Sequence, residues 1–365
     1  MLSESPANSP PMNVNRSGVI LPIQYLRGLA ALMVVWHHGT GQLDGLSEFF
    51  PWRFGTSGVD VFFVISGFIM VTATAGKRTT PLDFLARRFI RVVPLYWLLT
   101  LILVSILLVA PSLFRTVVLT TESLVKSLLF IPHYSPSHQG MIWPVLVPGW
   151  TLNFEMFFYA IFAASLAFRR PFAVLVATLT ALVLAGYVWG PFENPIARTY
   201  THPNLLEFLA GAAIAHAWIS GATEPRFAWS IGAMLVGTAL LLMPGSELFK
   251  QYAHLAGASL LVWGALSERI LQLRSPVLLI LGDASYSIYL THIFTLGACR
   301  WLWVKLGLDM PDLSFALTFM LTGLLACSVV GWLSYLLIEK PLLRRMHNAW
   351  RHKMGAGRAL LREGL

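Results

Sequence analysis

The chain has 365 residues, of which 56% are hydrophobic and only 12% are charged. Soluble domains carry about 25% charged residues, so this composition excludes an ordinary soluble protein and predicts a polytopic membrane protein. The net charge of +9 is not evidence for nucleic-acid binding. In a membrane protein, the positions of Lys and Arg residues indicate how the chain is oriented in the bilayer. Cys299 and Cys327 lie in separate late segments and predict neither a disulfide framework nor a metal site.

Residues 1–19 are rich in Pro, Ser and Asn and predict a disordered cytoplasmic tail rather than a signal peptide. Residues 20–343 predict an all-α bundle of about ten transmembrane helices, since a crossing needs about 20 mainly apolar residues. A basic tail, residues 344–365, is predicted on the cytoplasmic side, as an amphipathic helix on anionic lipid or as a solvated segment. The predicted spans are 20–39, 55–74, 91–110, 149–168, 171–190, 203–219, 229–245, 252–267, 277–298 and 313–337.

The Lys and Arg residues predict the orientation of this bundle. With the N-terminus in the cytoplasm, 19 of the 26 positive side chains fall in the inner turns and tails. This bias follows the positive-inside rule and predicts an N-in, C-in topology. The seven in outer loops are Arg53, Arg115, Lys126, Arg198, Lys250, Arg300 and Lys305. The run 123–134 in the long outer connection is too short to span and is predicted to lie at the interface or to re-enter.

The first apolar segment carries two polar residues on one predicted helix face. Arg27 and His38 are eleven residues apart, which is almost three whole turns, so they share a face roughly 16 Å apart along the axis. His37 is predicted to point well away from that face. An arginine inside an apolar span is costly without a partner and is a functional hypothesis by default.

Two carboxylates are predicted at a depth similar to that of His38. Asp60 lies five residues into the second span and Glu155 six residues into the fourth. A histidine with a carboxylate in reach is the usual arrangement of a general base, although a structural ion pair or a water-lined pore would use the same residues. Asp60 is flanked by small residues that let helices approach closely, which favours a structural role for it.

Two later motifs carry further candidates. Arg88 and Arg91 form one cationic face at the predicted start of the third span, which suits a phosphate ligand or an ordinary positive-inside anchor. Glu339 is predicted to pair with these arginines at the cytoplasmic end of the last span. A polar stripe in the span 277–298 must face the bundle, to line a tunnel or to bond neighbouring helices; it comprises Gly282, Ser285, Tyr286, Tyr289 and His292.

Seven motifs follow one another along the chain, and they are LRGLAALMVVWHH, GVDVFFVISGF, RRFIRVVPLYW, PGWTLNFEMFFY, EFLAG, SYSIYLTH and EKP. In this order, the motifs resemble the acyltransferase-3 family, particularly bacterial members that acetylate exopolysaccharides. The resemblance implies a multi-pass protein of the bacterial inner membrane that moves an acyl group, usually acetyl, from cytoplasmic acyl-CoA. The implied acceptor is a sugar hydroxyl of an exopolysaccharide or of a lipid-linked saccharide precursor. Acetyl-CoA is thus expected as a donor substrate, and no permanently bound cofactor is expected. Membrane lipid is an expected partner, and the sequence leaves open whether the protein forms a homo-oligomer.

The resemblance also implies roles for individual residues. Arg27 and His38 match the family's arginine–histidine motif, Arg88 and Arg91 its second arginine motif, and Glu155 its acidic fourth-helix position. On this basis the arginines bind acyl-CoA, His38 is the general base, and Glu155 orients the imidazole or the sugar; an acyl-histidine intermediate is the competing mechanism. The supporting residues are Asp60, Trp150, Asn153, Ser285, Tyr286, Tyr289 and His292.

Two other function classes fit the same spans. A secondary transporter or lipid-linked sugar flippase would use His38, Asp60 and Glu155 as a proton relay, but no internal repeat supports it. A non-enzymatic component of a polysaccharide-export complex would explain the topology but not why an arginine and a histidine share one buried face.

Overall fold

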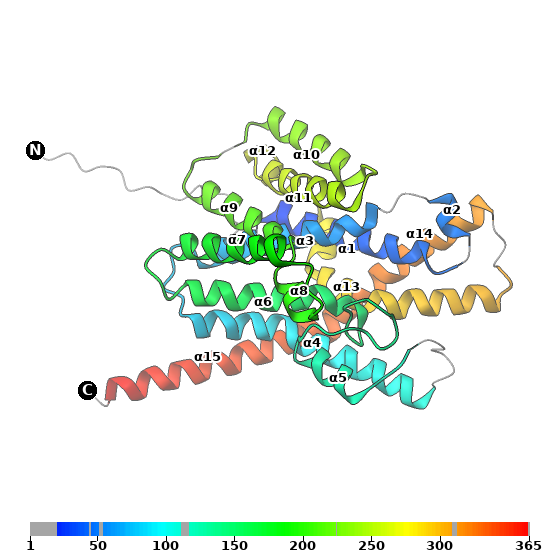
Figure 1. The fold of residues 1–365 in the computed structure, drawn as a ribbon, viewed down its shortest axis with the longest axis horizontal. Coiled ribbons are helices and arrows are strands. Elements are labelled where there is room, and N and C mark those ends of the chain that lie inside the picture. Colours follow the sequence, from blue (N-terminus) through cyan, green and yellow to red (C-terminus); the bar gives the residue numbers. More distant parts are fainter. Residues whose placement is uncertain are drawn as a thin grey trace, which may run out of the picture.

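The computed structural model describes residues 20–43, 45–50, 54–110, 117–223, 225–308 and 312–363, with side chains as far as residue 353. Every regular element within these ranges is a helix, which confirms the predicted all-α class (Figure 1). The predicted tail 1–19 lies outside the described residues, as do Arg53 and Arg115 of the predicted outer loops.

A helix occupies each of the ten predicted spans. Within the described residues, five helical stretches are long and apolar enough to cross a membrane: α3, α4, α7, α13 and the continuous stretch Leu313–Lys353. Of the others, α6, α9 and α10 have only 15 or 16 residues, and α1 and α11 carry polar side chains, so ten crossings and their orientation stay predictions. The helices are α1 Leu21–Thr40, α3 Ser57–Thr74, α4 Pro81–Val109, α6 Trp150–Ser165, α7 Pro171–Trp189, α9 Leu205–Ile219, α10 Phe227–Leu242, α11 Glu247–Gly264, α13 Pro276–Lys305 and α14 Leu313–Ser334.

Short helices connect these elements. One of them, α5, covers the first part of the run 123–134, and its eight residues are too few to span a bilayer, as predicted. It packs on α4, where Trp97 donates a hydrogen bond from Nε1 to the carbonyl oxygen of Leu128 at 2.8 Å. The connecting helices are α2 Leu46–Phe49, η1 Phe54–Thr56, α5 Thr121–Leu128, η3 Val147–Gly149, α8 Pro195–Tyr200 and α12 Glu268–Leu271.

Helix α4 begins ten residues before the predicted span. Thr80 caps it, because its Oγ1 accepts a hydrogen bond from the backbone N–H of Asp83 at 3.2 Å, and Pro81 occupies the first helical turn. Arg88 and Arg91 therefore lie inside the helix and not at its start, which corrects the predicted position. Their side chains can consequently project between helices instead of into water.

Small residues bring the central helices into close contact. A Cβ atom on Gly211 of α9 would lie 1.8 Å from the carbonyl oxygen of Val64 on α3, and one on Gly67 would lie 1.9 Å from that of Phe208. At the crossing of α1 and α13, a Cβ on Gly282 would lie 2.2 Å from the carbonyl oxygen of Gln24. Such contacts hold helices together in lipid, where burial of apolar surface gives no driving force.

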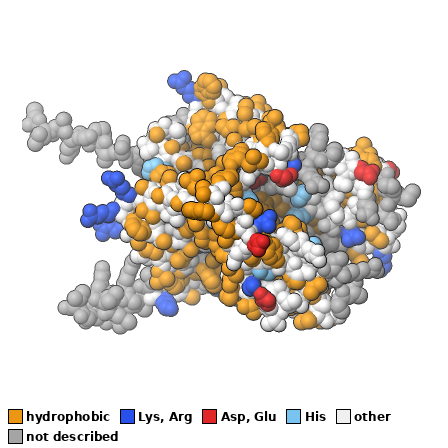
Figure 2. Space-filling model, in the orientation of Figure 1, with side chains coloured by type: hydrophobic (Ala, Val, Ile, Leu, Met, Phe, Trp, Pro, Cys, Tyr) orange, Lys and Arg blue, Asp and Glu red, His pale blue; other side chains and the backbone are white. Residues whose placement is uncertain are grey.

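The surface has the polarity of a membrane protein. Figure 2 shows hydrophobic side chains over much of this face, with Lys and Arg at its left edge and further charged side chains in its centre and right half. Large apolar side chains are widely exposed, for example Leu108 at 72%, Val109 at 86% and Trp189 at 72%. Soluble proteins rarely expose contiguous apolar surface of this extent, so these side chains face lipid.

The end of the bundle is continuous with the predicted basic tail. A π-helical turn, η4 Tyr335–Glu339, joins α14 directly to α15 Lys340–Glu363. The tail predicted from residue 344 is thus part of a helix that begins earlier. The indole Nε1 of Trp350 donates to Asp83 Oδ1 at 3.0 Å, so α15 is held alongside the first turns of α4 (Figure 1).

Candidate active site

The three predicted arginines meet in one cavity of about 800 Å³ including its open mouth. We call it the arginine cavity; its walls come from α1, α3, α4, α6 and α13. It is lined by both members of the second arginine motif and by the arginine of α1, so these residues converge as predicted. Its polar lining is Arg27, Ser66, Arg88, Arg91, Thr151, Glu155, Tyr159, Tyr286 and Tyr289.

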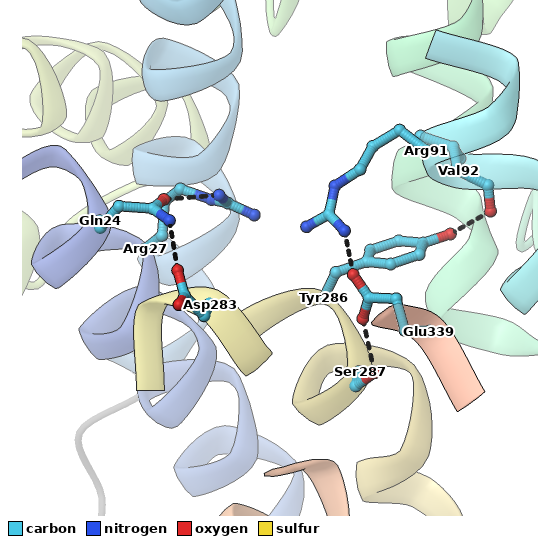
Figure 3. Close-up of polar contacts among 8 residues, drawn as sticks. All are labelled: Gln24, Arg27, Arg91, Val92, Asp283, Tyr286, Ser287 and Glu339. Atoms are coloured by element: carbon cyan, nitrogen blue, oxygen red, sulfur yellow. Dashed lines mark hydrogen bonds and ion pairs between the residues drawn. The ribbon is translucent and has the colours of Figure 1, made fainter. Parts of the chain in front are cut away.

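Arg91 is fixed by an ion pair with Glu339, the last residue of the π-helical turn (Figure 3). Glu339 is 2% exposed, and its other oxygen accepts a hydrogen bond from Ser287 Oγ at 2.6 Å. The guanidinium group also lies over the ring of Tyr286, whose hydroxyl donates to the carbonyl oxygen of Val92 at 2.6 Å. The predicted pairing of Glu339 with the arginines is thereby confirmed.

Arg27 approaches from the opposite wall, and Figure 3 shows its guanidinium group pointing toward that of Arg91. Its Nη1 donates to Gln24 Oε1 at 2.6 Å, and Gln24 Nε2 donates to Asp283 Oδ1 at 2.8 Å. Asp283 thus reaches Arg27 only through a neutral amide. Arg27 forms no ion pair within the described part of the chain, so its positive charge stays available to the cavity.

Arg88 is the least satisfied of the three. Its Nε is buried and has no hydrogen-bond partner among the described residues, and its guanidinium carbon lies 5.7 Å from the ring centre of Phe84. Glu155 lies in the same cavity, where its Oε2 accepts a hydrogen bond from Tyr159 at 2.7 Å. Three guanidinium groups thus face two carboxylates, those of Glu155 and Glu339, which makes the cavity suited to an anion.

His38 lines a second and wider cavity of about 3610 Å³ including its mouth, which we call the histidine cavity. His37 lines it too, although it was predicted to point well away from the face of His38. The cavity surrounds the end of α1, so residues 100° apart on the helix both reach it. Its polar and aromatic lining includes His37, His38, Asp60, Trp143, Trp150, Asn153, Arg198, His202, Lys250 and His254.

The imidazole of His38 faces that of His292, with ring centres 4.9 Å apart. His292 is fully buried, and its Nδ1 lies 2.6 Å from the carbonyl oxygen of Tyr289. A carbonyl can only accept, so Nδ1 carries the proton and Nε2 carries a lone pair. That Nε2 is buried without a partner among the described residues. The histidine predicted only as a supporting residue therefore lies beside the predicted base.

The two cavities share Tyr289 and Val59 as a common wall. The hydroxyl of Tyr289 donates to the carbonyl oxygen of Pro148 at 2.9 Å and lies 2.9 Å from Thr151 Oγ1. Its ring packs edge-on against Phe62, with centres 5.8 Å apart. A group passing from one cavity to the other would therefore pass this tyrosine.

Glu155 does not lie beside His38. The predicted similarity of depth is misleading because different faces of helix α6 line the two cavities. Trp150 and Asn153 line the histidine cavity, whereas Thr151 and Glu155 line the arginine cavity. Asp60 does line the histidine cavity, and its partner is His254, whose Nδ1 lies 3.0 Å from Asp60 Oδ2.

The rest of the predicted polar stripe faces the bundle, as expected. Tyr286 and Tyr289 line the arginine cavity, and Ser285 is fully buried with its Oγ unpaired among the described residues. Sequence reasoning missed His254 and Tyr159. Tyr159 could have been found from its spacing of one helical turn after Glu155, whereas nothing in the sequence connects His254 with Asp60. No three His, Cys, Asp or Glu side chains in the described ranges are grouped to hold a metal ion.

Comparisons with known proteins assign the chain to a family. A family model described as an acyltransferase domain matches residues 21–338. The exopolysaccharide production protein ExoZ of Rhizobium meliloti is 43% identical over 304 residues, which cover 80% of this chain and 90% of that protein. The acyltransferase MdmB of Streptomyces mycarofaciens is 25% identical over 326 residues, covering 80% of this chain and 81% of its own. No solved structure matches significantly. The chain therefore belongs to the acyltransferase-3 family and is a multi-pass membrane enzyme that transfers acyl groups other than aminoacyl groups.

Proposed function

We propose that the enzyme transfers an acyl group, acetyl in the first instance, from cytoplasmic acyl-CoA to a sugar hydroxyl of an exopolysaccharide or its lipid-linked precursor. The proposed location is the inner membrane of a bacterium. The observation that carries the proposal is that a cationic cavity and a histidine-lined cavity meet at one wall, Tyr289. The similarity to ExoZ of Rhizobium meliloti, which is named as an exopolysaccharide production protein, supports a polysaccharide acceptor.

The arginine cavity suits the phosphate groups of coenzyme A, because guanidinium groups match phosphate oxygens in pairs of hydrogen bonds. Within the described residues, the buried Nε of Arg88 has no hydrogen-bond partner, and Arg27 forms no ion pair with a carboxylate. Arg91 is already paired with Glu339. Arg88 and Arg27 therefore bind the donor, and Arg91 holds the wall against which the donor lies.

His38 is the proposed general base, and His292 takes the orienting role that the resemblance gave to Glu155. His292 Nε2 has no hydrogen-bond partner among the described residues, and its ring lies 4.9 Å from that of His38 between centres. In the proposed reaction, one ring N–H of His38 turns to donate to this lone pair, which leaves the other nitrogen of His38 as the base. This nitrogen takes the hydroxyl proton while the sugar oxygen attacks the thioester carbonyl. The new C–O bond forms, the C–S bond breaks, and the coenzyme A thiolate takes the proton from His38.

Glu155 has a different proposed role, because it lies with the arginines and Tyr159. Its negative charge offsets part of the charge of Arg27 and Arg88 while the donor is absent. A buried cation without any counter-charge would be strongly unfavourable. Glu155 is thus a residue of the donor site and not of the base.

The test is acyl transfer in membrane vesicles supplied with radiolabelled acetyl-CoA and deacylated exopolysaccharide from the producing strain. His38→Ala should lower the rate by about 10²–10⁴-fold, the usual contribution of a general base. His216→Ala is the matched control, because His216 stacks on Phe172 outside both cavities and should leave the rate unchanged. Wild-type rates in His38→Ala, at equal protein in the membrane, would refute the role of His38.

A second measurement tests the reaction class in cells. Mass spectrometry of the polysaccharide with and without the gene should show loss of one acyl group, and it identifies the sugar that carried it. Saccharide uptake by reconstituted vesicles in the absence of acyl-CoA, together with an unchanged polymer, would instead support a transporter.

A further inference from the structure

One histidine of the histidine cavity has the carboxylate partner that His38 lacks among the described residues. His254 of α11 lies with its Nδ1 3.0 Å from Oδ2 of Asp60 on α3. The two side chains are 12% and 15% exposed, and both line the cavity. The pair is thus anchored between two helices and open to the cavity on one side.

Helix α9 supports Asp60 on the side away from the histidine cavity. Glu207 of α9 is 1% exposed and interacts with Asp60. Helices α3 and α9 are in backbone contact at Gly67 and Gly211, so this arrangement has little freedom to shift. Asp60 is therefore held between Glu207 and His254, with His254 on the side of the cavity.

The chemistry of the pair selects the kind of ligand it can bind. The carboxylate accepts a hydrogen bond from Nδ1–H, so in the neutral ring Nε2 carries the lone pair. Nε2 forms no hydrogen bond within the described residues, so it can accept one from a ligand hydroxyl. The negative charge of Asp60 disfavours an anion such as phosphate at this point. The ligand group is therefore an uncharged or positively charged donor, and a sugar hydroxyl is such a donor.

The surrounding walls fit a ligand with many hydroxyl groups. The amide of Asn153 can both donate and accept, and the indole rings of Trp143 and Trp150 offer flat apolar faces beside polar groups. A few directional polar groups set in an apolar and aromatic wall are typical of sites that bind small organic ligands. A saccharide presents both hydroxyl edges and apolar faces.

We propose that the Asp60–His254 pair binds a hydroxyl group of the acceptor saccharide and so sets the affinity for the acceptor. The inference rests on the proposed function, since it takes the acceptor to be a saccharide. It gives Asp60 a ligand-binding role where the sequence favoured a structural one. It also separates the tasks of two histidines, with His254 binding the acceptor and His38 acting on it.

The direct test measures binding without the donor. The full chain in lipid nanodiscs is titrated calorimetrically with deacylated oligosaccharide fragments of the producing strain's own exopolysaccharide. His254→Ala and Asp60→Asn should each weaken Kd about tenfold, the size expected for one lost hydrogen bond to a charged or polarised group. Since the two residues act as one unit, the double variant should be no weaker than either single variant. His216→Ala should bind like the wild type.

A kinetic measurement separates acceptor binding from a purely structural role. Both variants should raise KM for the acceptor about tenfold, while kcat and KM for acetyl-CoA change less than twofold. Unchanged Kd in both variants, or wild-type protein that does not bind the fragments at all, would overturn the inference. Should Asp60→Asn fail to accumulate in membranes, His254→Ala decides the outcome alone.

The same experiment keeps the two proposals apart. Wild-type protein that binds the fragments through His254 but transfers no acyl group from acetyl-CoA would reject the proposed function and support the saccharide site. Acyl transfer that depends on His38, together with an unchanged Kd in both variants, would support the function and reject the site.

Discussion

The arginine cavity and the histidine cavity differ in the charge of the groups that are left without a partner. In the first, Arg91 has the counter-charge of Glu339, whereas the buried Nε of Arg88 has no partner among the described residues. Next to His38 of the second, the buried Nε2 of His292 also has no partner within the described ranges. The first cavity thus offers donors on a cation, which suit an anion, and the second lies beside a free lone pair on a neutral ring, which suits a donor.

The largest expected effect comes from removing that counter-charge. Glu339→Gln leaves Arg91, whose side chain is 26% exposed, beside a neutral amide. The free energy of unfolding should fall by about 3 kcal/mol, the low end for losing one partner of a buried pair, because solvent screens part of the charge. Thermal unfolding of the purified protein in detergent measures it as a fall in Tm. The double variant Arg91→Leu with Glu339→Leu should recover most of the loss, and a Tm unchanged by Glu339→Gln would show that the pair does not stabilise the cavity.

Removing the free lone pair should affect the rate and not the fold. His292→Asn keeps a donor near the Nδ1 position but lacks Nε2, and should lower kcat roughly 10²-fold through loss of orientation of the base. His292→Gln places an amide oxygen near the Nε2 position and should restore part of the rate. Equal rates in the two variants would mean that His292 only fills space beside His38.

Donor binding should depend on the arginine that has no protein partner. Arg88→Ala should raise KM for acetyl-CoA about tenfold to a hundredfold, since hydrogen bonds between charged groups contribute about 1.5–3 kcal/mol. Arg87→Ala is the matched control, because Arg87 is 59% exposed and paired with Asp83. If both variants raised KM equally, general surface charge and not the cavity would bind the donor.

The smallest effect should come from the wall between the cavities. Tyr289→Phe removes the hydrogen bond to Pro148, and a loss of about 1 kcal/mol should increase opening of the wall roughly fivefold. Water would then reach the thioester more often. Release of radiolabelled acetate from acetyl-CoA without acceptor measures this, and wild-type hydrolysis in Tyr289→Phe would show that the hydroxyl does not close the wall.

Sequence reasoning located the elements of this molecule better than their contacts. The positions of ten helices and the convergence of Arg27, Arg88 and Arg91 follow from hydropathy, helical spacing and the charge bias of one end. Glu339 was assigned to the arginines for the same reason. These features are local, or depend only on which end of the bundle a residue occupies.

The errors concern which helix faces which. Depth along a helix does not say which neighbour a side chain meets, so Glu155 was placed beside His38 when it lines the arginine cavity. The pairing of Asp60 with His254 joins residues 194 positions apart and depends on how α11 packs on α3. The capped start of α4 was missed because Thr80 and Pro81 precede the apolar run.

Helix α1 runs between the two cavities and contributes Arg27 to one and His38 to the other, with its backbone fixed against α13 at Gly282. Under the proposed function, coenzyme A stays on one side and the sugar on the other, and only the acyl unit changes sides. The lipid barrier then needs no opening wide enough for either substrate. The cell could thus modify a polymer outside its permeability barrier without exporting an activated donor or dissipating its ion gradients.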